Sequence, residues 1–339
     1  MMDSLLKELC LTDSASGREK NVRDLIISKI EGHCEYKVDA LGNIIAFKKG
    51  RKTPKNKIML DAHTDEVGVI VTGADSDGFL KFSNVGGIDT KVLLARVICF
   101  ENGVKGVVGV KPIHLLDKDE AGKIPSKDEL YIDIGANSKE EALSLVPPGM
   151  TGVFSVEYTE FGEHKIMSKA LDDRAGCFVL IDIIRSEIEY DAWFSFSVQE
   201  EIGARGAGVS AYTINPDYAV VIETTTAADI IDVPEHRRVC ELGRGAAISF
   251  MDRSTVYLPE VYSRAVETAE KNSISYQMKT LVAGGNNAGS VHKTRAGVKT
   301  VTINIPCRYL HSPSCVCDER DIRSVRDLAA ALIIEFAND

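Results

Sequence analysis

Residues 57–68 read KIMLDAHTDEVG, a short apolar strand that runs directly into a group of acids around a histidine. Ile58, Met59 and Leu60 form the apolar part, and His63 and Asp65 follow it. In open α/β sheets, ligands bind at the carboxyl ends of the strands. The segment therefore predicts a buried strand of such a sheet with a functional site at its end.

Other acids and histidines stand at the boundaries of predicted elements, namely Asp172, Asp173, Glu200, Glu201, Glu223 and His311. Each alone has an ordinary explanation, because an aspartate before a helix caps it and a glutamate pair at a turn is solvated. Their joint position at strand ends is harder to explain in this way. Imidazole and carboxylate ligands without thiolates suit zinc, cobalt or manganese, so the pattern indicates a metal site.

Strands alternate with helices before residue 67 and after residue 163, which predicts an α/β fold with a doubly wound mixed sheet. Examples are the strands at 192–198, 218–222 and 300–305 and the helices at 175–188, 257–271 and 319–336. Between them the chain has short alternating runs of Val, Ile and Gly, including a predicted strand at 92–100, which is typical of a small all-β domain. We expect a catalytic domain of residues 1–66 and 164–339 and an inserted domain of residues 67–163.

The N-terminal part carries two local signals. Ser16 and Glu19 have the spacing of a capping box before the apolar positions Val22 and Ile26, which predicts a helix that begins there. Leu41-Gly42 separates two short strand patterns and predicts a hairpin turn.

The net charge is −10, from 40 basic and 50 acidic residues, which argues against a nucleic-acid or membrane-surface partner. No apolar run reaches the roughly 18 residues of a membrane-spanning helix. The first residues lack the apolar region of a secretory signal. The eight cysteines are scattered, so we expect reduced thiols and a cytoplasmic protein.

Five ordered motifs resemble those of the M42 family of metallo-aminopeptidases, and they are Asp61-Ala-His63-Thr-Asp65-Glu66-Val-Gly68, Ala170-Leu-Asp172-Asp173-Arg174-Ala-Gly176, Val198-Gln-Glu200-Glu201-Ile-Gly203, Ile222-Glu223-Thr-Thr225 and Arg308-Tyr-Leu-His311-Ser-Pro313. Their order and separations match over essentially the whole chain. The resemblance implies an enzyme that removes N-terminal residues from peptides with a free N-terminus. It also implies a PDZ-like inserted domain for dimerisation and assembly of the dimers into a dodecamer.

The resemblance further implies a role for each matching residue. Two divalent cations, zinc or cobalt with manganese as an alternative, would share Asp172 and be held by His63, Asp172, Glu201, Glu223 and His311. Glu200 would be the general base that activates the water between the cations. Asp65 would accept the free ring N–H of His63 and fix its tautomer.

The sequence departs from the family pattern in two places, at Glu223 and at Asn286-Asn287. Glu223 stands where Asp is usual, and Asn286-Asn287 replaces a Thr-Asp pair, which predicts weaker affinity for basic substrate side chains. Three alternatives to an aminopeptidase stay open: a related metal-dependent amidohydrolase or deacylase, an endoglucanase, as some relatives are labelled, and an inactive scaffold. Glycoside hydrolysis uses paired carboxylates and needs no histidine ligands, so His63 and His311 favour the peptidase.

Overall fold

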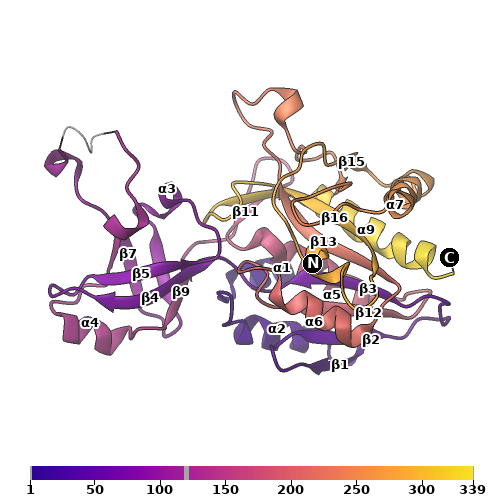
Figure 1. The fold of residues 1–339 in the computed structure, drawn as a ribbon, viewed down its shortest axis with the longest axis horizontal. Coiled ribbons are helices and arrows are strands. Elements are labelled where there is room, and N and C mark those ends of the chain that lie inside the picture. Colours follow the sequence, from indigo (N-terminus) through magenta and orange to yellow (C-terminus); the bar gives the residue numbers. More distant parts are fainter. Residues whose placement is uncertain (1, 118–121, 339) are drawn as a thin grey trace.

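The structure, a computed structural model, describes residues 2–117 and 122–338, so residues 118–121 of the predicted insertion lie outside it. These residues form two bodies, a large mixed sheet covered by helices and a closed β-barrel beside it (Figure 1). In the described ranges, no helix has the length and apolar character that crossing a membrane requires.

The large sheet is built around four parallel strands. Its order is β1 (Glu35–Val38), β2 (Ile44–Lys48), β12 (Ala192–Ser197), β3 (Ile58–His63), β13 (Tyr218–Thr226), β16 (Lys299–Arg308), β17 (Cys315–Asp318), β11 (Lys165–Ser168) and β10 (Thr159–Phe161). β12, β3, β13 and β16 run parallel, and the strands toward both edges pair antiparallel. β14 (Ala246–Ile248) and β15 (Tyr276–Met278) extend the sheet beside β16. The carboxyl ends of the four parallel strands therefore meet at one edge.

Helices cover both faces of this sheet. The core of one face contains residues of α1 (Met2–Leu11), α2 (Lys20–Ile30), α5 (Leu171–Arg185), α7 (Pro259–Lys271) and α9 (Glu319–Phe336). The core of the other face contains residues of α6 (Arg205–Ile214) and α8 (Ala288–Val291). This arrangement confirms the predicted α/β fold with a large mixed sheet.

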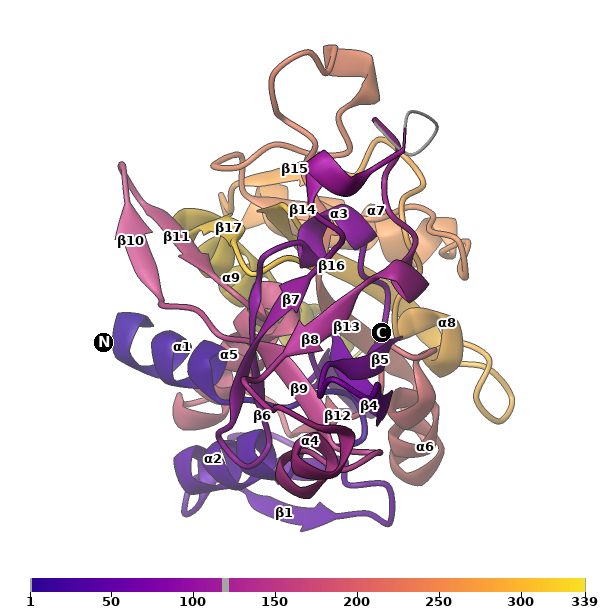
Figure 2. The same ribbon diagram turned by 90° about the vertical axis from the view of Figure 1, so that its left-hand side faces the viewer.

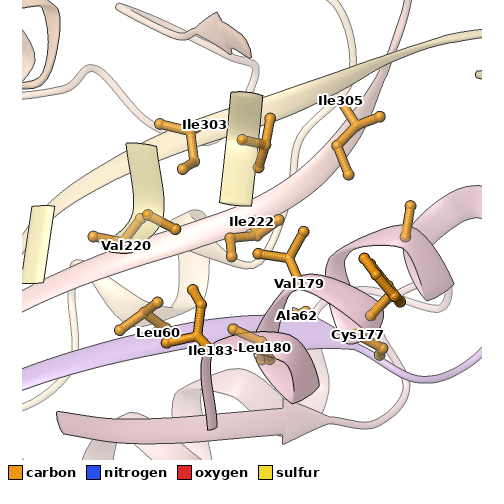
Figure 3. Close-up of a cluster of buried hydrophobic side chains, with 14 of the residues drawn as sticks. Leu60, Ala62, Cys177, Val179, Leu180, Ile183, Val220, Ile222, Ile303 and Ile305 are labelled. Carbon is orange, nitrogen blue, oxygen red and sulfur yellow. The ribbon is translucent and has the colours of Figure 1, made fainter. Parts of the chain in front are cut away.

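Side-chain alternation along the central strands separates the two cores. Leu60, Val220 and Ile222 pack against α5, where Figure 3 shows them facing Val179 and Ile183. Their sequence neighbours, such as Met59 and Val221, belong to the core under α6 and α8. Because successive strand residues point to opposite faces, His63 and Glu223 fall on the α6 and α8 side.

The barrel has its own hydrophobic core. Its strands follow the order β4 (Gly68–Ala74), β5 (Leu80–Val85), β8 (Tyr131–Asp133), β7 (Lys105–Gly109), β6 (Val97–Phe100) and β9 (Thr151–Phe154). Each strand contributes a buried residue to one cluster, including Val69, Leu80, Ile98, Val108, Ile132 and Phe154. In Figure 2 the barrel faces the viewer, with α4 (Lys139–Leu145) beside it. β10 lies before residue 164 but pairs with β11 in the large sheet.

Two local predictions are wrong. Residues 92–100 are not one strand, because α3 (Thr90–Leu93) begins after Asp89, whose side chain accepts a hydrogen bond from the Lys91 N–H, and β6 starts only at Val97. Ser16 and Glu19 do not form a capping box on α2, which has no side-chain cap. The Ser16 hydroxyl instead donates to Asp65 at 2.6 Å. The predicted hairpin at Leu41-Gly42 is confirmed, since β1 and β2 pair antiparallel.

Candidate metal centre

All predicted site residues lie together at the edge where the parallel strands end, and they are His63, Asp65, Asp172, Glu200, Glu201, Glu223 and His311. His63 is the last residue of β3, and Glu223 lies in the part of β13 beyond its pairing with β3. Glu200 and Glu201 follow β12, and His311 lies in the loop between β16 and β17. The parallel order of the strands therefore creates the site.

Asp172, in the first turn of α5, lies between the two histidines. Its Oδ1 is 3.2 Å from Nε2 of His63, and its Oδ2 is 3.4 Å from Nε2 of His311. Glu223 Oε1 lies 3.3 Å from the same nitrogen of His63, and Glu201 Oε2 lies 3.2 Å from that of His311. The result is two sets of three ligand atoms, each with one histidine, one glutamate and one oxygen of Asp172.

The spacing and chemistry of these atoms fit divalent cations. Ligands bound tetrahedrally at about 2.0–2.1 Å stand about 3.3–3.4 Å apart, and all four measured distances lie near that value. The donor set contains imidazole nitrogen and carboxylate oxygen, which suits zinc, cobalt or manganese. The spacing and donor chemistry of these residues therefore fit bound divalent metal.

The outer nitrogens of both rings point at backbone carbonyls. Nδ1 of His63 lies 3.1 Å from the carbonyl oxygen of Asp65, and Nδ1 of His311 lies 2.7 Å from that of Gly87. A proton on each Nδ1 leaves the Nε2 lone pairs directed at the carboxylates. Gly87 follows β5 of the barrel, so the barrel segment helps to orient His311. The Asp65 carboxylate, expected to accept from the ring, is farther away, with Oδ1 at 3.4 Å.

The Asp65 carboxylate mainly holds the turn that carries Glu200 and Glu201. Its Oδ1 accepts a hydrogen bond from the Glu200 N–H at 2.9 Å, and its Oδ2 accepts one from the Glu201 N–H at 3.1 Å. The Ser16 hydroxyl completes this set at 2.6 Å. Glu19 supports the same turn by accepting a hydrogen bond from the Gln199 N–H at 3.2 Å. Sequence reasoning missed both roles because it assigned Ser16 and Glu19 to a helix cap.

The electrostatics of the cluster favour a bound cation. Burial raises the pKa of Glu200 to about 7 and that of Glu223 to about 8, and it raises the pKa of Glu201 well above its usual range. Burial opposes the charged form of His311, but Asp172 and Glu201 raise the pKa of that imidazole to about 10. In the described part of the chain, no lysine or arginine forms an ion pair with these carboxylates. Buried carboxylates without such partners commonly coordinate metals, which displace the protons.

Two buried neighbours of the ligands have structural roles. Asp173 also has an oxygen within 4.8 Å of His63 and Glu223 ligand atoms, but its Oδ1 accepts a hydrogen bond from the Gly176 N–H at 3.1 Å. The capping explanation thus applies to Asp173, and the close contacts with both histidines belong to Asp172. The Cys177 thiol donates to the His63 carbonyl at 3.1 Å, and burial raises its pKa, so it is not a thiolate ligand.

A cavity of about 690 Å³ opens over the cluster. Glu200 lines it and has no hydrogen-bond or ion-pair partner for its side chain among the residues that the structure describes. Asn286 also lines the cavity, whereas Asn287 is buried beneath it and donates to Asp61 Oδ2 at 2.8 Å. The Asn287 amide therefore does not face substrate, which is contrary to the expectation that it sets affinity for basic side chains.

Comparison with known proteins agrees with this site. A family model described as M42 glutamyl aminopeptidase matches residues 42–328. A protein of Acetivibrio thermocellus, whose assignment as an aminopeptidase is provisional, is 40% identical over 98% of both chains. The lysyl aminopeptidase of Pyrococcus furiosus is 36% identical, covering 98% of this chain and 96% of its own. The chain is a hydrolase of peptide bonds. It belongs to the M42 family, which confirms the predicted family and enzyme class.

Solved structures share the whole fold. An aminopeptidase from the archaeon Desulfurococcus kamchatkensis superposes with a TM-score of 0.94 at 36% identity, covering 99% of this chain and 95% of that one. The TET1 peptidase of Pyrococcus horikoshii, described as able to assemble into a tetrahedron or a large octahedral shell, has a TM-score of 0.87 at 33% identity over the full length of both. A Thermotoga maritima protein named endoglucanase has a TM-score of 0.80 at 37% identity, with 97% and 96% covered.

Proposed function

We propose that the chain is a dinuclear metal-dependent aminopeptidase that removes N-terminal residues from peptides. The observation that carries this proposal is the position of Asp172, which directs one carboxylate oxygen toward each histidine at 3.2 and 3.4 Å. A shared carboxylate with a histidine and a glutamate on either side could hold two cations close enough to act on one substrate. Zinc or cobalt, with manganese as an alternative, matches the donor atoms.

The protein groups would act as follows. Two divalent cations held by the cluster would polarise the scissile carbonyl and lower the pKa of a water molecule. The Glu200 carboxylate accepts the proton of the attacking water and donates it to the nitrogen of the leaving amine. Its free side chain in the cavity and the hydrogen bond from its N–H to Asp65 support this role. Glu223 would hold the free α-amine of the substrate, which restricts cleavage to the first residue.

The test is hydrolysis of unblocked aminoacyl-p-nitroanilides by chelated protein and by protein reloaded with zinc, cobalt or manganese. We expect metal-dependent release in the parent protein and its loss in Glu200→Gln, while Glu200→Gln still binds two metal ions per chain by elemental analysis. Release that survives in Glu200→Gln would contradict the assigned base. Equal release from N-acetylated substrates would favour a deacylase or another amidohydrolase.

Glycoside hydrolysis is a second candidate function, because the similar structure from Thermotoga maritima is called an endoglucanase. Here, however, the Glu201 and Glu223 carboxylates are engaged with His311 and His63 rather than free to flank a sugar. A glycosidase needs two carboxyl groups at the scissile bond and no metal. Cleavage of cello-oligosaccharides that persists in EDTA would support the second candidate.

We also propose that residues 67–163 form a PDZ-like domain that pairs two chains, and that such dimers assemble into a dodecamer of about tetrahedral form in the cytoplasm. The TET1 peptidase of Pyrococcus horikoshii, described as forming a tetrahedron or a larger shell, supports this. Apolar side chains on the barrel segment are open to a partner, since Ile113 is 83%, Leu115 57% and Ile124 56% exposed. Light scattering of the parent and of Ile113→Asp would test the assembly, and we expect the variant to be smaller.

A further inference from the structure

Two buried cationic side chains stand on either side of Asp172 in the sequence. Lys169 lies between β11 and α5, just before Asp172, and Arg174 follows Asp172 within α5. The Lys169 side chain is 3% exposed and that of Arg174 is 0% exposed. Buried charges are costly unless they are paired and hydrogen-bonded, so the partners of these side chains show what they do.

Lys169 holds the acid at the end of the turn that follows His63. Its Nζ lies 2.8 Å from Oε1 and 2.9 Å from Oε2 of Glu66, whose side chain is 4% exposed. The third N–H of the ammonium is taken by Asp13 Oδ1 at 2.8 Å. Glu66 Oε1 also accepts a hydrogen bond from the Ser14 N–H at 3.0 Å. The donors of Lys169 are therefore used within the protein.

Arg174 holds the same turn at a second point. Its Nε donates to the carbonyl oxygen of Thr64 at 3.0 Å, and its Nη2 lies 3.6 Å from Glu66 Oε1. The turn after His63 is therefore tied to both flanks of Asp172, through one backbone carbonyl and through one carboxylate.

These ties border the metal cluster without forming part of it. In the ranges 2–117 and 122–338, Lys169 forms no ion pair with Asp172 or Glu201. A cavity of about 10 Å³ is lined by Lys169 and Glu66 together with Asp172, Glu201 and His311. Because Lys169 and Glu66 carry opposite charges, the pair adds no net charge beside the cluster. Its effect on the ligands therefore passes through their positions.

The relative position of His63 and Asp172 depends on these ties. Their facing atoms, Nε2 and Oδ1, lie 3.2 Å apart although the two residues come from β3 and α5. Nδ1 of His63 points at the carbonyl oxygen of Asp65, which lies between the tied residues Thr64 and Glu66. A displacement of about 1 Å between reacting groups can lower a rate by roughly 100-fold.

We propose that Lys169 and Glu66 are positioning residues, which fix the separation of His63 and Asp172 that lets both bind one cation. Arg174 assists them at Thr64. This inference rests on the proposed metal-dependent function and names residues that act on its site through the ligands. Replacing such partners of metal ligands typically lowers metal affinity or activity by roughly 10- to 100-fold.

The first measurement is cobalt binding by Lys169→Met, Glu66→Gln and a matched control, Asp13→Asn. Asp13 also accepts from Lys169, but it is 41% exposed and lies outside the turn. Chelated proteins are titrated with Co²⁺ against a competing chelator, and the visible absorption of the bound ion reports the geometry of its ligands. The cobalt Kd should rise by roughly 10- to 100-fold in Lys169→Met and Glu66→Gln, with altered absorption bands. Asp13→Asn should bind cobalt as the parent protein does.

The second measurement separates kcat from KM at saturating cobalt. Among the described residues, those that line the substrate cavity do not include Lys169 or Glu66. With the best p-nitroanilide substrate of the parent protein, kcat of Lys169→Met should fall by roughly 10-fold or more, while KM changes little. A rise in KM alone would mean that the substitution has altered the substrate cavity, which contradicts the inference.

A double variant separates positioning from stability. Each single substitution leaves a buried charge without its partner, which destabilises the fold, whereas removing both charges is often neutral. The Tm of chelated Lys169→Met/Glu66→Gln should therefore lie closer to the parent Tm than that of Lys169→Met. Its cobalt Kd should nevertheless stay roughly 10-fold or more above the parent value, because the tie between the two segments is still absent.

Recovery of the cobalt Kd together with the Tm in the double variant would overturn the inference, because the pair would then act on stability alone. Parent-like cobalt binding in both single variants would overturn it as well. If Lys169→Met does not fold, Glu66→Gln and the double variant decide, since glutamine keeps an acceptor for the Ser14 N–H. Parent protein that neither binds cobalt nor releases N-terminal residues would overturn the proposed function, and the inference with it.

Discussion

The side-chain carboxylate of Asp65 accepts a hydrogen bond from the backbone N–H of Glu200 at 2.9 Å. The same carboxylate accepts hydrogen bonds from the Glu201 N–H and the Ser16 hydroxyl. One buried acid thus fixes the turn that presents both the proposed base and a proposed metal ligand. The N-terminal segment, far from these residues in sequence, takes part in the site through Ser16.

Ser16→Ala tests this arrangement. The substitution removes the hydroxyl donor to a buried carboxylate, an interaction worth about 1.5–3 kcal/mol. We expect kcat to fall by roughly 10-fold with little change in KM, because the turn becomes less well positioned while the cavity stays intact. Ser16→Thr keeps the hydroxyl and should retain most of the activity. Equal losses in Ser16→Thr and Ser16→Ala would show that the hydroxyl is not the cause.

Metal loading should stabilise the fold. A ligand that binds only the folded state at 100 times its Kd adds about 2.7 kcal/mol to the free energy of unfolding. We expect zinc or cobalt to raise the Tm of chelated parent protein and to raise that of Glu200→Gln equally, since Glu200 is not a proposed ligand. His63→Ala should lose much of the shift. A full shift in His63→Ala would place the cations elsewhere.

Local patterns in the sequence predict the sheet and the gathering of acids and histidines at its edge, whereas the division of these residues into metal ligands and base comes from the family resemblance and stays a proposal. Residues 57–68 show the pattern of a buried apolar strand followed by an acid or a histidine. The strands β3, β12, β13 and β16 run parallel, so the residues that follow their carboxyl ends meet at one edge of the sheet. The hairpin at Leu41-Gly42 was predictable for the same reason, since its turn residues lie between two alternating segments.

Interactions between distant residues could not be predicted in this way. Ser16 and Glu19 have capping-box spacing, yet Ser16 donates to a residue 49 positions away and Glu19 accepts from one 180 positions away. Likewise, the carbonyl of Gly87 in the barrel segment orients His311, and the buried Lys279 lines the cavity of the cluster. Local spacing does not predict such contacts, because they form between residues that only the folded tertiary structure brings together.

Asn287→Asp should destabilise the protein rather than alter substrate choice. The Asn287 amide donates to Asp61 Oδ2 at 2.8 Å and to the Ser197 hydroxyl at 2.9 Å, and both acceptors are fully buried. The variant replaces a donor by a second carboxylate, which should cost at least about 1–3 kcal/mol. Burial already raises the pKa of Asp61 to about 6. Below that pH, the two carboxyl groups of the variant can share a proton. Above it both are charged and repel each other, so the loss in free energy of unfolding should grow as pH rises from 5 to 8.

Urea unfolding of chelated Asn287→Asp and parent protein at both pH values measures this effect. Asn338→Asp, at an exposed position near the end of the chain, provides the control for an added charge and should change stability little. Unaltered stability of Asn287→Asp together with a gain in lysyl hydrolysis would instead restore the original expectation that this position faces substrate.

The decrease in the free energy of unfolding at acid pH should depend on Asp318, which joins β17 to α9. Burial alone would raise its pKa, but hydrogen bonds from Arg320 and Lys165 outweigh burial and lower the pKa to about 2. The pKa of an unfolded aspartate is about 3.9. Below pH 3.9 the unfolded state binds a proton that the folded state does not, so the stabilisation is present above about pH 4 and is lost as pH falls toward 2.

Asp318→Asn should therefore lower the free energy of unfolding of chelated protein by about 1–2 kcal/mol at pH 5–7, a value reduced from the full linkage for solvent screening. The difference between parent and variant should shrink between pH 4 and pH 2. Asp182→Asn removes an acid that pairs with Arg326 but is 46% exposed, so its effect should be smaller. A difference between Asp318→Asn and parent that stays constant from pH 6 to pH 2 would mean that packing or helix capping, not the carboxylate charge, is what Asp318 contributes.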